Sequence, residues 1–467
     1  MKRLLSYLLV MASAAVLWSC GGNADPDPDP TPAAPKTVTL SSSSANVAQA
    51  GEEITLDITA PARPVISGAP DWISVRDGIY NSQTYVMTGV KLTVAANTTY
   101  ETRTATLTVK AGTASATFQV SQAGRTKPAD PDNKNLSKTL VTTSPSANAK
   151  ALYDWMLGIY CKQTLSCAMA DVAWNQAEAD WVQKWTGKYT AVNTYDYIHL
   201  ASSPANWIDY GDMSVPDKWY NGGGIVSACW HWNVEKSEGA GGWTCTPSET
   251  NFHPSNVMKE GTWENRQAKA DLKKIAGYLK QLQDRGIAVI WRPMHEAAGN
   301  TYTQWHSGAW FWWGRDGGET YRELWKFVFN YFKEAGLDNL IWVWTCQATG
   351  ADDDDSAFYP GDDYVDLVAA DIYNVADADV LADRFRFLAG KYPKKMITLG
   401  ECGNVPDMGA QWEAGAKWLY FMPWYDYNHD QSEDYAHTHA NITWWKKTFA
   451  CEAVLTRDEL PSDLFTK

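Results

Sequence analysis

The sequence is short of basic residues: 40 lysines and arginines stand against 54 aspartates and glutamates, for a net charge of −14 over 467 residues. Nucleic-acid binding depends on basic patches that neutralise phosphates, so this balance argues against a nucleic-acid partner. The same charge repels strongly anionic polysaccharides at long range. A neutral polymer would meet no such repulsion.

Cysteine is also scarce, with eight residues whose spacing resembles no metal site. Seven remain once Cys20, which ends the N-terminal export segment, is set aside, and an odd number leaves at least one unpaired. Export would permit disulfides, either between Cys161 and Cys167 or between Cys229 and Cys245. We expect neither a metal nor a cofactor.

The N-terminal apolar run, residues 4–16, is shorter than the roughly 20 residues that a membrane-spanning helix needs. Lys2 and Arg3 precede it, so residues 1–20 are predicted to be a signal peptide. Cys20 resembles the cysteine of a bacterial lipobox, which implies a lipid at Cys20 and export to the outer membrane, on the cell surface or its periplasmic face. An ordinary signal peptide cut nearby is the alternative. The Asp/Pro-rich residues 21–35 predict a semi-rigid spacer.

Residues 36–124 are rich in Thr, Val, Ser and Ala and alternate apolar with polar positions, which predicts an all-β sandwich. Segments 71–75, 92–97 and 120–124 resemble the BACON family of immunoglobulin-like modules, common in secreted proteins of the Bacteroidetes. Carbohydrate binding has been suggested for such modules, but a structural spacer is the interpretation we favour, with Trp72 in the core. A polar linker follows at residues 125–135.

Residues 136–467 alternate predicted strands with helices, the clearest helices covering 266–284, 319–334 and 380–391. Eight such units predict an α/β fold, a (β/α)8 TIM barrel. An open doubly wound sheet would have fewer strands and usually a glycine-rich phosphate turn, and none is evident. The eight predicted strands are centred on residues 164–168, 191–195, 225–231, 288–293, 340–345, 367–371, 396–400 and 418–423.

Two glutamates stand where predicted barrel strands end. Glu296 closes the segment WRPMHE of strand four, and Glu401 closes TLGE of strand seven. Active groups cluster at this end of barrel strands, and glycoside hydrolysis needs two carboxylates there. The 25 tryptophans, of which only Trp18 and Trp72 precede residue 136, also suit a cleft that stacks sugar rings, although most are expected to fill the core.

Five segments, taken in order, resemble glycoside hydrolase family 26: residues 227–233, 291–296, 309–314, 371–374 and 399–403. Most barrel relatives place Asn before the acid/base glutamate, whereas this family has His, and His295 matches. The resemblance implies a retaining endo-β-1,4-mannanase in which Glu296 is the acid/base and Glu401 the nucleophile. Retention requires their carboxyls to lie ~5–5.5 Å apart, and the charges then keep Glu296 protonated.

The same resemblance implies which residues contact the sugar. Tyr373 would orient the nucleophile, Trp313 would serve the neighbouring subsite, and Trp312 is expected in the core. The full set of implied binding residues is His231, His295, Trp310, Trp313, Tyr373 and Trp424. The expected partner is neutral β-mannan, galactomannan or glucomannan, bound by a monomer.

Several alternatives stay open. Glu296 and Glu401 could be structural ion-pair partners, for example with Arg292. The same mechanism could act on xylan or mixed-linkage β-glucan, or the barrel could be a non-catalytic glycan-binding lipoprotein. The long segments 245–263 and 297–308 depart from the family and are expected to reshape the rim. The acidic run at 352–355 is predicted to be a solvated loop rather than a calcium site.

Overall fold

The computed structural model describes residues 33–171, 174–299, 308–347, 355–426, 432–433 and 436–465. The predicted signal peptide, Cys20 and most of the spacer therefore lie outside the described residues. The chain divides into two compact units, residues 1–126 and 127–467. Among the described residues no helix is long and apolar enough to cross a membrane.

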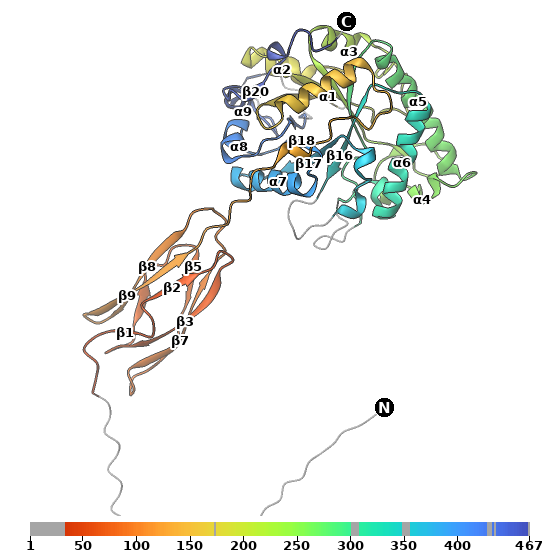
Figure 1. Cartoon of the computed structure of the whole chain (residues 1–467). Coiled ribbons are helices and arrows are strands. Elements are labelled where there is room, and N and C mark those ends of the chain that lie inside the picture. Colours follow the sequence, from red (N-terminus) through yellow and green to blue (C-terminus); the bar gives the residue numbers. More distant parts are fainter. Residues whose placement is uncertain are drawn as a thin grey trace, which may run out of the picture. The chain divides into compact units, whose positions relative to one another are not determined.

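The first unit is a sandwich of two sheets, one ordered β1–β3–β7–β5 with β6 beside β7, the other β2–β9–β8–β4 (Figure 1). Every second residue of these strands points into the core: Leu107 and Val109 of β8, and Phe118 and Val120 of β9, are buried. The predicted immunoglobulin-like sandwich is confirmed. Its strands are β1 (Thr39–Leu40), β2 (Ser44–Val47), β3 (Glu52–Thr59), β4 (Val65–Ser67), β5 (Ile73–Arg76), β6 (Ile79–Asn81), β7 (Val86–Val94), β8 (Arg103–Ala111) and β9 (Ala114–Gln122).

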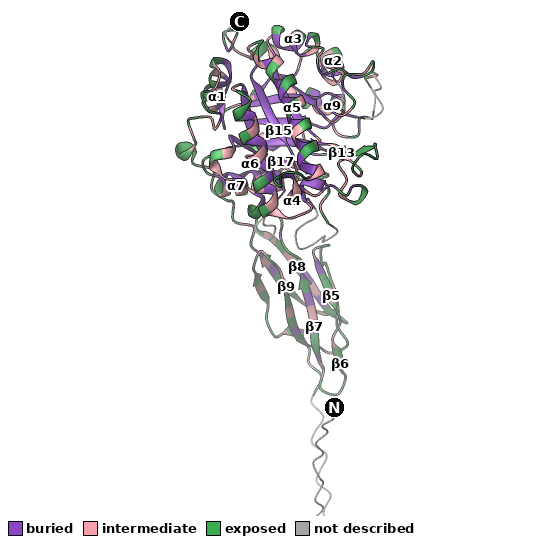
Figure 2. Cartoon of the chain, turned by 90° about the vertical axis from the view of Figure 1, so that its right-hand side faces the viewer, coloured by how far each residue is buried: buried purple, intermediate pink, exposed green. Residues whose placement is uncertain are grey.

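The second unit is a closed barrel of eight parallel strands, ordered β11–β12–β15–β16–β17–β18–β19–β10, with β10 pairing back onto β11. These strands are almost wholly buried at the centre of the unit, as expected when helices cover a parallel sheet (Figure 2). Each coincides with a predicted strand, so the TIM barrel is confirmed. They are β10 (Thr164–Met169), β11 (Val192–Asp196), β12 (Ile225–Trp230), β15 (Val289–Pro293), β16 (Leu340–Cys346), β17 (Leu367–Tyr373), β18 (Met396–Gly403) and β19 (Tyr420–Pro423).

The outer layer contains the three helices predicted from apolar spacing and several shorter ones. The longest begins at Trp263 because Thr262 caps it, its hydroxyl accepting the backbone N–H of Asn265 at 3.1 Å. Between β16 and β17 the described residues contain only short 3-10 turns. The main helices are α1 (Ala147–Ile159), α2 (Ala177–Thr186), α3 (Ser214–Asn221), α5 (Trp263–Gln283), α6 (Gly318–Glu334), α7 (Ala378–Lys391), α8 (Met408–Ala414) and α9 (Ile442–Phe449).

The second unit also contains shorter strands outside the eight-stranded barrel. A hairpin of β13 (Val234–Glu235) and β14 (Trp243–Thr244) follows β12, and β20 (Val454–Leu455) runs beside β10. No disulfide joins the described cysteines, so neither local pair that the sequence allowed is present.

Asp355 corrects one prediction. It ends the acidic run expected to be a solvated loop, yet it is fully buried. It accepts hydrogen bonds from the backbone N–H of Gln347 (2.6 Å) and the thiol of Cys346 (3.3 Å), and its carboxylate lies 3.4 Å from Lys391 Nζ. These partners compensate the cost of burying the charge. Residues 352–354 lie outside the described part of the chain.

Candidate active site

A β-bulge immediately precedes Glu401. Asp371 of β17 pairs with Glu401 while Ala370 pairs with Leu399, so Gly400 is an extra residue in β18. Such bulges re-aim a side chain, and they recur beside active sites. Gly400 has no room for a side chain, because a Cβ there would lie 2.8 Å from Asp371 Oδ1. The glycine and the bulge together orient Glu401.

The carboxylate of Glu401 is held by donors on both oxygens. Arg292 Nη2 donates to Oε1 at close range, and the Tyr373 hydroxyl donates to Oε2 at 2.7 Å. His295 Nε2 lies 3.6 Å from Oε1. Arg292 also donates to Asp371 Oδ2 at 3.0 Å, which fixes its guanidinium plane. Charge-assisted hydrogen bonds of this kind favour one carboxylate orientation.

Glu296 lies on a strained turn directly after β15. Met294 and Glu296 have left-handed backbone angles (φ 46° and 54°), which cost about 1 kcal/mol or more each for residues other than glycine. Two hydrogen bonds hold the turn: Tyr321 donates to the Met294 carbonyl at 3.0 Å, and Trp313 Nε1 donates to the His295 carbonyl at 2.8 Å. The surrounding barrel therefore fixes where the Glu296 side chain begins.

The surroundings of Glu296 favour its protonated form. Burial and the nearby carboxylates of Asp371 and Glu401 raise the pKa of Glu296 well above its ordinary value. A hydrogen bond from Gln347 and the charge of Arg292 oppose this rise without cancelling it. A carboxylic acid that keeps its proton at neutral pH can act as a general acid.

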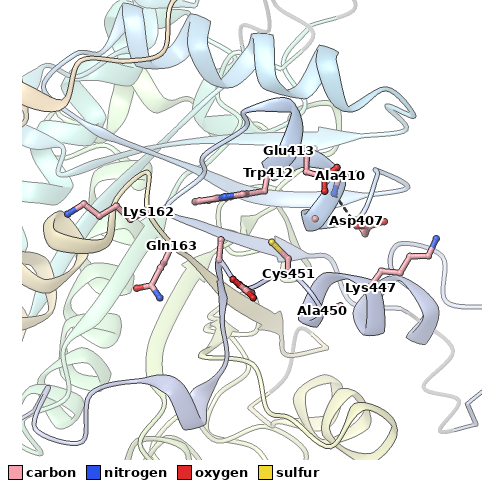
Figure 3. Close-up of a pocket in the computed structure, with 12 residues that line it drawn as sticks. Lys162, Gln163, Asp407, Ala410, Trp412, Glu413, Lys447, Ala450 and Cys451 are labelled. Atoms are coloured by element: carbon pink, nitrogen blue, oxygen red, sulfur yellow. Dashed lines mark hydrogen bonds between the residues drawn. The ribbon is translucent and has the colours of Figure 1, made fainter.

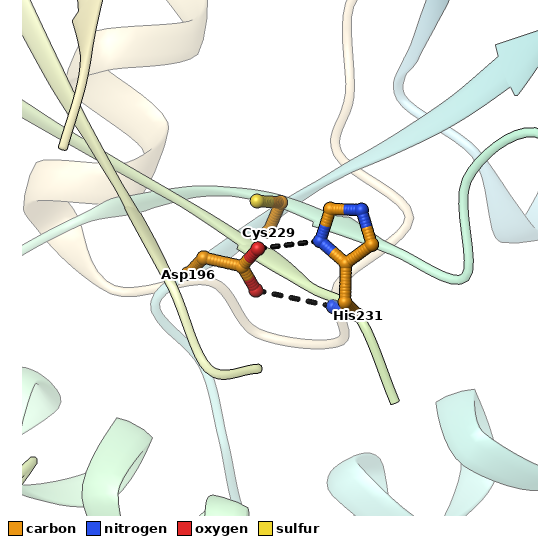
Figure 4. Close-up of side chains that lie close together, drawn as sticks. All are labelled: Asp196, Cys229 and His231. Atoms are coloured by element: carbon orange, nitrogen blue, oxygen red, sulfur yellow. Dashed lines mark hydrogen bonds and ion pairs between the residues drawn. The ribbon is translucent and has the colours of Figure 1, made fainter. Parts of the chain in front are cut away.

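Two histidines from adjacent strands meet edge to face, with ring centroids 4.3 Å apart. His231 donates its backbone N–H to Asp196 Oδ1 at 3.1 Å, and its Nδ1 makes a close hydrogen bond to Oδ2 (Figure 4). Burial lowers the pKa of His231, but the Asp196 carboxylate outweighs it, so the net shift is upward. Burial, Arg292 and His231 lower the pKa of His295 well below its ordinary value. The environment thus favours the cationic form of His231 and the neutral form of His295.

Asp196, Cys229 and His231 have the spacing of a metal site, because one ligand atom from each lies within 4.8 Å of the others. Both oxygens of Asp196 already accept hydrogen bonds from His231, Oδ1 from its backbone N–H and Oδ2 from its ring Nδ1 (Figure 4). Burial raises the pKa of the Cys229 thiol well above its ordinary value, whereas a metal ligand must be a thiolate. The role of these three residues is therefore better explained as orienting His231 than as binding a metal ion.

The tryptophans that were predicted to bind the sugar differ in their solvent exposure. Trp424 follows β19 and is nearly buried, with its ring 5.8 Å from that of His231. Trp310 is 42% exposed and packs over Gly299, where a Cβ would lie 2.4 Å from the indole. Trp313, expected at a neighbouring subsite, is instead fully buried and offers no face to a sugar. Trp312 is fully buried, as predicted.

The structure adds residues that the sequence reasoning did not single out. Phe311 lies between the histidines and Trp313, with its ring stacked 4.4 Å from the indole. His439, in the loop after β19, has its ring 5.6 Å from Tyr373. The others are Asp196, Gln347 and Asp371. These three lie at or just beyond barrel strand ends, so the rule that found the two glutamates could have found them.

A separate hollow of about 920 Å3 lies between α8 and α9 (Figure 3). Trp412 forms one of its walls, and Gln163, which directly precedes β10, lines it as well. It therefore lies near the amino ends of the strands, whereas Glu296 and Glu401 lie at or beyond their carboxyl ends.

Two family models match parts of this chain. A family model described as glycosyl hydrolase family 26 matches residues 141–459. A second model, BACON, described as a putative N-terminal binding domain, matches residues 62–123. Mannan endo-1,4-beta-mannosidase B of Piromyces sp is 33% identical over 70% of this chain and 54% of its own length. The chain spans about half of each of two such Piromyces proteins.

Solved structures match the barrel. The GH26 domain of an endo-beta-mannanase/endo-beta-glucanase from Prevotella bryantii is 40% identical, with a TM-score of 0.64 over 69% of this chain and 99% of that one. A β-mannanase from a symbiotic protist of the termite Reticulitermes speratus, complexed with gluco-manno-oligosaccharide, is 33% identical, with a TM-score of 0.58 over 70% and 98%. Since the family model covers more than half of the sequence, this chain belongs to glycosyl hydrolase family 26.

Proposed function

We propose that this protein is a retaining endo-β-1,4-mannanase. The observation that carries the proposal is the contrast between its two carboxyl groups. Glu401 is fixed by Arg292 and Tyr373, whereas the pKa of Glu296 is raised well above its ordinary value. Double displacement requires two nearby carboxyl groups, one oriented to attack and the other able to hold a proton for the leaving group.

In the first step, Glu401 attacks the anomeric carbon while Glu296 donates its proton to the leaving glycosidic oxygen. In the second, Glu296 removes a proton from water, which displaces Glu401 and restores the original anomeric configuration. The ion pair between Arg292 and Glu401 is compatible with this role, because it engages only Oε1, while Oε2 accepts one hydrogen bond from Tyr373 and keeps a second lone pair.

We infer that His231, His295, Trp310 and Trp424 bind the sugar at the cleaved linkage. His295 lies beside the catalytic carboxylate, with its Nε2 3.6 Å from Glu401 Oε1 and its ring centroid 4.3 Å from that of His231. Trp313 acts indirectly: its indole holds the His295 carbonyl and supports the turn before Glu296.

The proposed substrate is mannan, galactomannan or glucomannan, supported by the names of the relatives. β-Glucan is the second candidate, because the Prevotella bryantii protein is described as both a mannanase and a glucanase. Reducing-sugar release from galactomannan, glucomannan, xylan and mixed-linkage glucan separates these substrates. Hydrolysis of the mannans first is expected, and inactivity on every mannan would end the proposal.

A non-catalytic glycan-binding role is tested by Glu401→Ala. Turnover is expected to vanish while binding to mannan in a native gel persists. Substantial residual hydrolysis would mean that another group is the nucleophile.

We also propose lipid attachment at Cys20 and display on the outer membrane, supported by the sequence of residues 1–20. Labelling cells with a radioactive fatty acid tests this. The wild-type protein should carry label and Cys20→Ala should not; unlabelled wild type would favour an ordinary signal peptide.

A further inference from the structure

The hollow between α8 and α9 is separate from the candidate active site. Its volume of about 920 Å3 lies within the range of roughly 300–1,000 Å3 that small-molecule sites occupy. Gln163 and Ala453 line it and directly precede β10 and β20, so it lies near the amino ends of these strands. A six-residue strand such as β10 spans roughly 20 Å. A ligand in the hollow therefore does not overlap with one held between Glu296 and Glu401.

The indole of Trp412 forms one wall of the hollow and is held from behind. Lys417 lies over one face of this half-buried indole, with its Nζ 3.9 Å from the ring centroid, and donates to the Trp412 carbonyl oxygen at 2.6 Å. Lys417 does not line the hollow, and the indole has Gln163 and Cys451 across from it there (Figure 3). An indole held in this way loses little conformational entropy when a ligand binds.

The rest of the lining is mostly polar and carries charges of both signs. Lys162 and Lys447 stand against Asp407, Glu413 and Glu452, so the hollow attracts neither anions nor cations strongly. Glu413 and Glu452 are exposed, so an incoming ligand can reach their carboxylates. Carboxylates accept hydrogen bonds and ammonium groups donate them, and sugar hydroxyls can pair with either.

An indole beside such donors and acceptors has the chemistry that recognises a sugar ring. The C–H face of a pyranose stacks on the flat apolar indole while its hydroxyls bind the polar groups around it. An apolar ligand such as a lipid chain would need a mostly apolar lining, which this hollow lacks. The balance of charges favours a neutral sugar over an anionic one.

We propose that the hollow is a second glycan-binding site, in which Trp412 stacks a hexopyranose of the same neutral polysaccharide that is cleaved at Glu296 and Glu401. The choice of polysaccharide rests on the proposed function, whereas the binding of a neutral sugar does not. The hollow holds another stretch of the polymer, or a neighbouring chain, while the active site works. Binding at two places raises the effective concentration of the substrate, which matters most when the substrate is insoluble.

The first test compares the rate of hydrolysis of insoluble mannan with that of mannotetraose, using the full-length protein. A free mannotetraose molecule gains nothing from a second site a strand length away. Trp412→Ala should therefore lower the ratio of the two rates about three- to tenfold, and Trp412→Phe should restore most of it. Trp155→Ala is the matched control, because this half-buried tryptophan of α1 does not line the hollow. Its ratio should equal that of the wild type.

Three outcomes of this comparison would overturn the inference. They are an unchanged ratio in Trp412→Ala, an equal loss on both substrates, and the same drop in Trp155→Ala.

The second test needs no hydrolysis, because Cys451 lines the hollow and a bound sugar should shield its thiol from iodoacetamide. In Glu401→Ala, mannohexaose at about ten times its Kd should slow the alkylation of Cys451, followed by mass spectrometry, about tenfold. Adding Trp412→Ala to this variant should abolish the shielding, whereas adding Trp155→Ala should preserve it.

A Cys451 thiol that does not react, or that reacts equally fast with and without mannohexaose, would overturn the inference. If the wild type hydrolyses neither mannan nor mannotetraose, the proposed function has failed. The shielding of Cys451 then still decides whether the hollow binds a neutral sugar.

Discussion

At the residue scale, Asp371 helps to keep the proton on Glu296. Its carboxylate raises the pKa of Glu296, second only to burial. Catalysis needs protonated Glu296, so kcat/KM should fall as pH rises through that pKa. Asp371→Asn removes the raising charge, so the alkaline limb of the pH profile should move to lower pH. Asp363→Asn, at an exposed carboxylate, is the control, and an unmoved limb in Asp371→Asn would contradict this role.

Asp196 is a positioning residue that acts through His231. Asp196→Ala should lower kcat/KM about 100-fold, because misplacing a binding group by an ångström has effects of that size. Asp196→Asn should lose less, since the amide oxygen can still accept from Nδ1. The pKa of His231 should fall when the Asp196 carboxylate is removed. In the pH profile of kcat/KM, the limb that reports the titration of His231 should therefore move to lower pH. Equal losses in both variants would point to a merely structural role.

At this scale the sequence predicted the two carboxyl groups that we propose to react, but not the residues that support them. Glu296 and Glu401 are visible because each follows an apolar strand. The strand-end rule could have found Asp196 too, but not its hydrogen bond to His231, because the two residues lie 35 positions apart and the pairing of β11 with β12 brings them together. The prediction for Trp313 was wrong because adjacent tryptophans look alike in sequence, whereas the turn at 312–314 buries both Trp312 and Trp313.

At the scale of elements, the bulge in β18 is the feature on which Glu401 depends. Gly400→Ala would place a Cβ 2.8 Å from both Asp371 Oδ1 and Ala369 Cβ. We expect a loss of about 1–3 kcal/mol in the free energy of unfolding. We also expect kcat to fall about 100-fold, because Glu401 moves. Wild-type kcat in a folded variant would show that the bulge does not orient the nucleophile.

A matched control for that variant is Gly390→Ala. Gly390 lies near the end of α7, and a Cβ at this position would meet nothing within 4 Å, so alanine there should be tolerated. Circular dichroism on heating, with kcat measured on the same preparations, separates the two effects.

Helices and strands were predicted well where a periodic apolar pattern specifies them. The prediction was poorer where contacts between individual side chains decide the structure. The eight barrel strands are apolar runs that tertiary burial preserves. Asp355 was misplaced because its polarity indicates solvent, whereas the backbone N–H of Gln347 and the thiol of Cys346 satisfy it inside. Such compensation depends on side-chain geometry and leaves no pattern in the sequence.

At the scale of the whole molecule, the sandwich and the barrel have separate hydrophobic cores. We therefore predict that the barrel, residues 127–467, folds without the first unit. Its thermal midpoint should stay within a few degrees of the matching transition in the full chain, and kcat on mannotetraose should be unchanged. A barrel that aggregates, or that loses kcat, would show that the first unit does more than act as a spacer.

The central claim is double displacement on a β-mannosidic linkage, and the stereochemistry of the first product tests it most directly. Proton NMR should follow hydrolysis of mannohexaose within the first minutes, before mutarotation mixes the anomers. The account predicts that the β-anomer of the new reducing end appears first and the α-anomer only later. Early accumulation of the α-anomer would mean inversion by a single displacement, and would contradict the assignment of Glu401 as nucleophile.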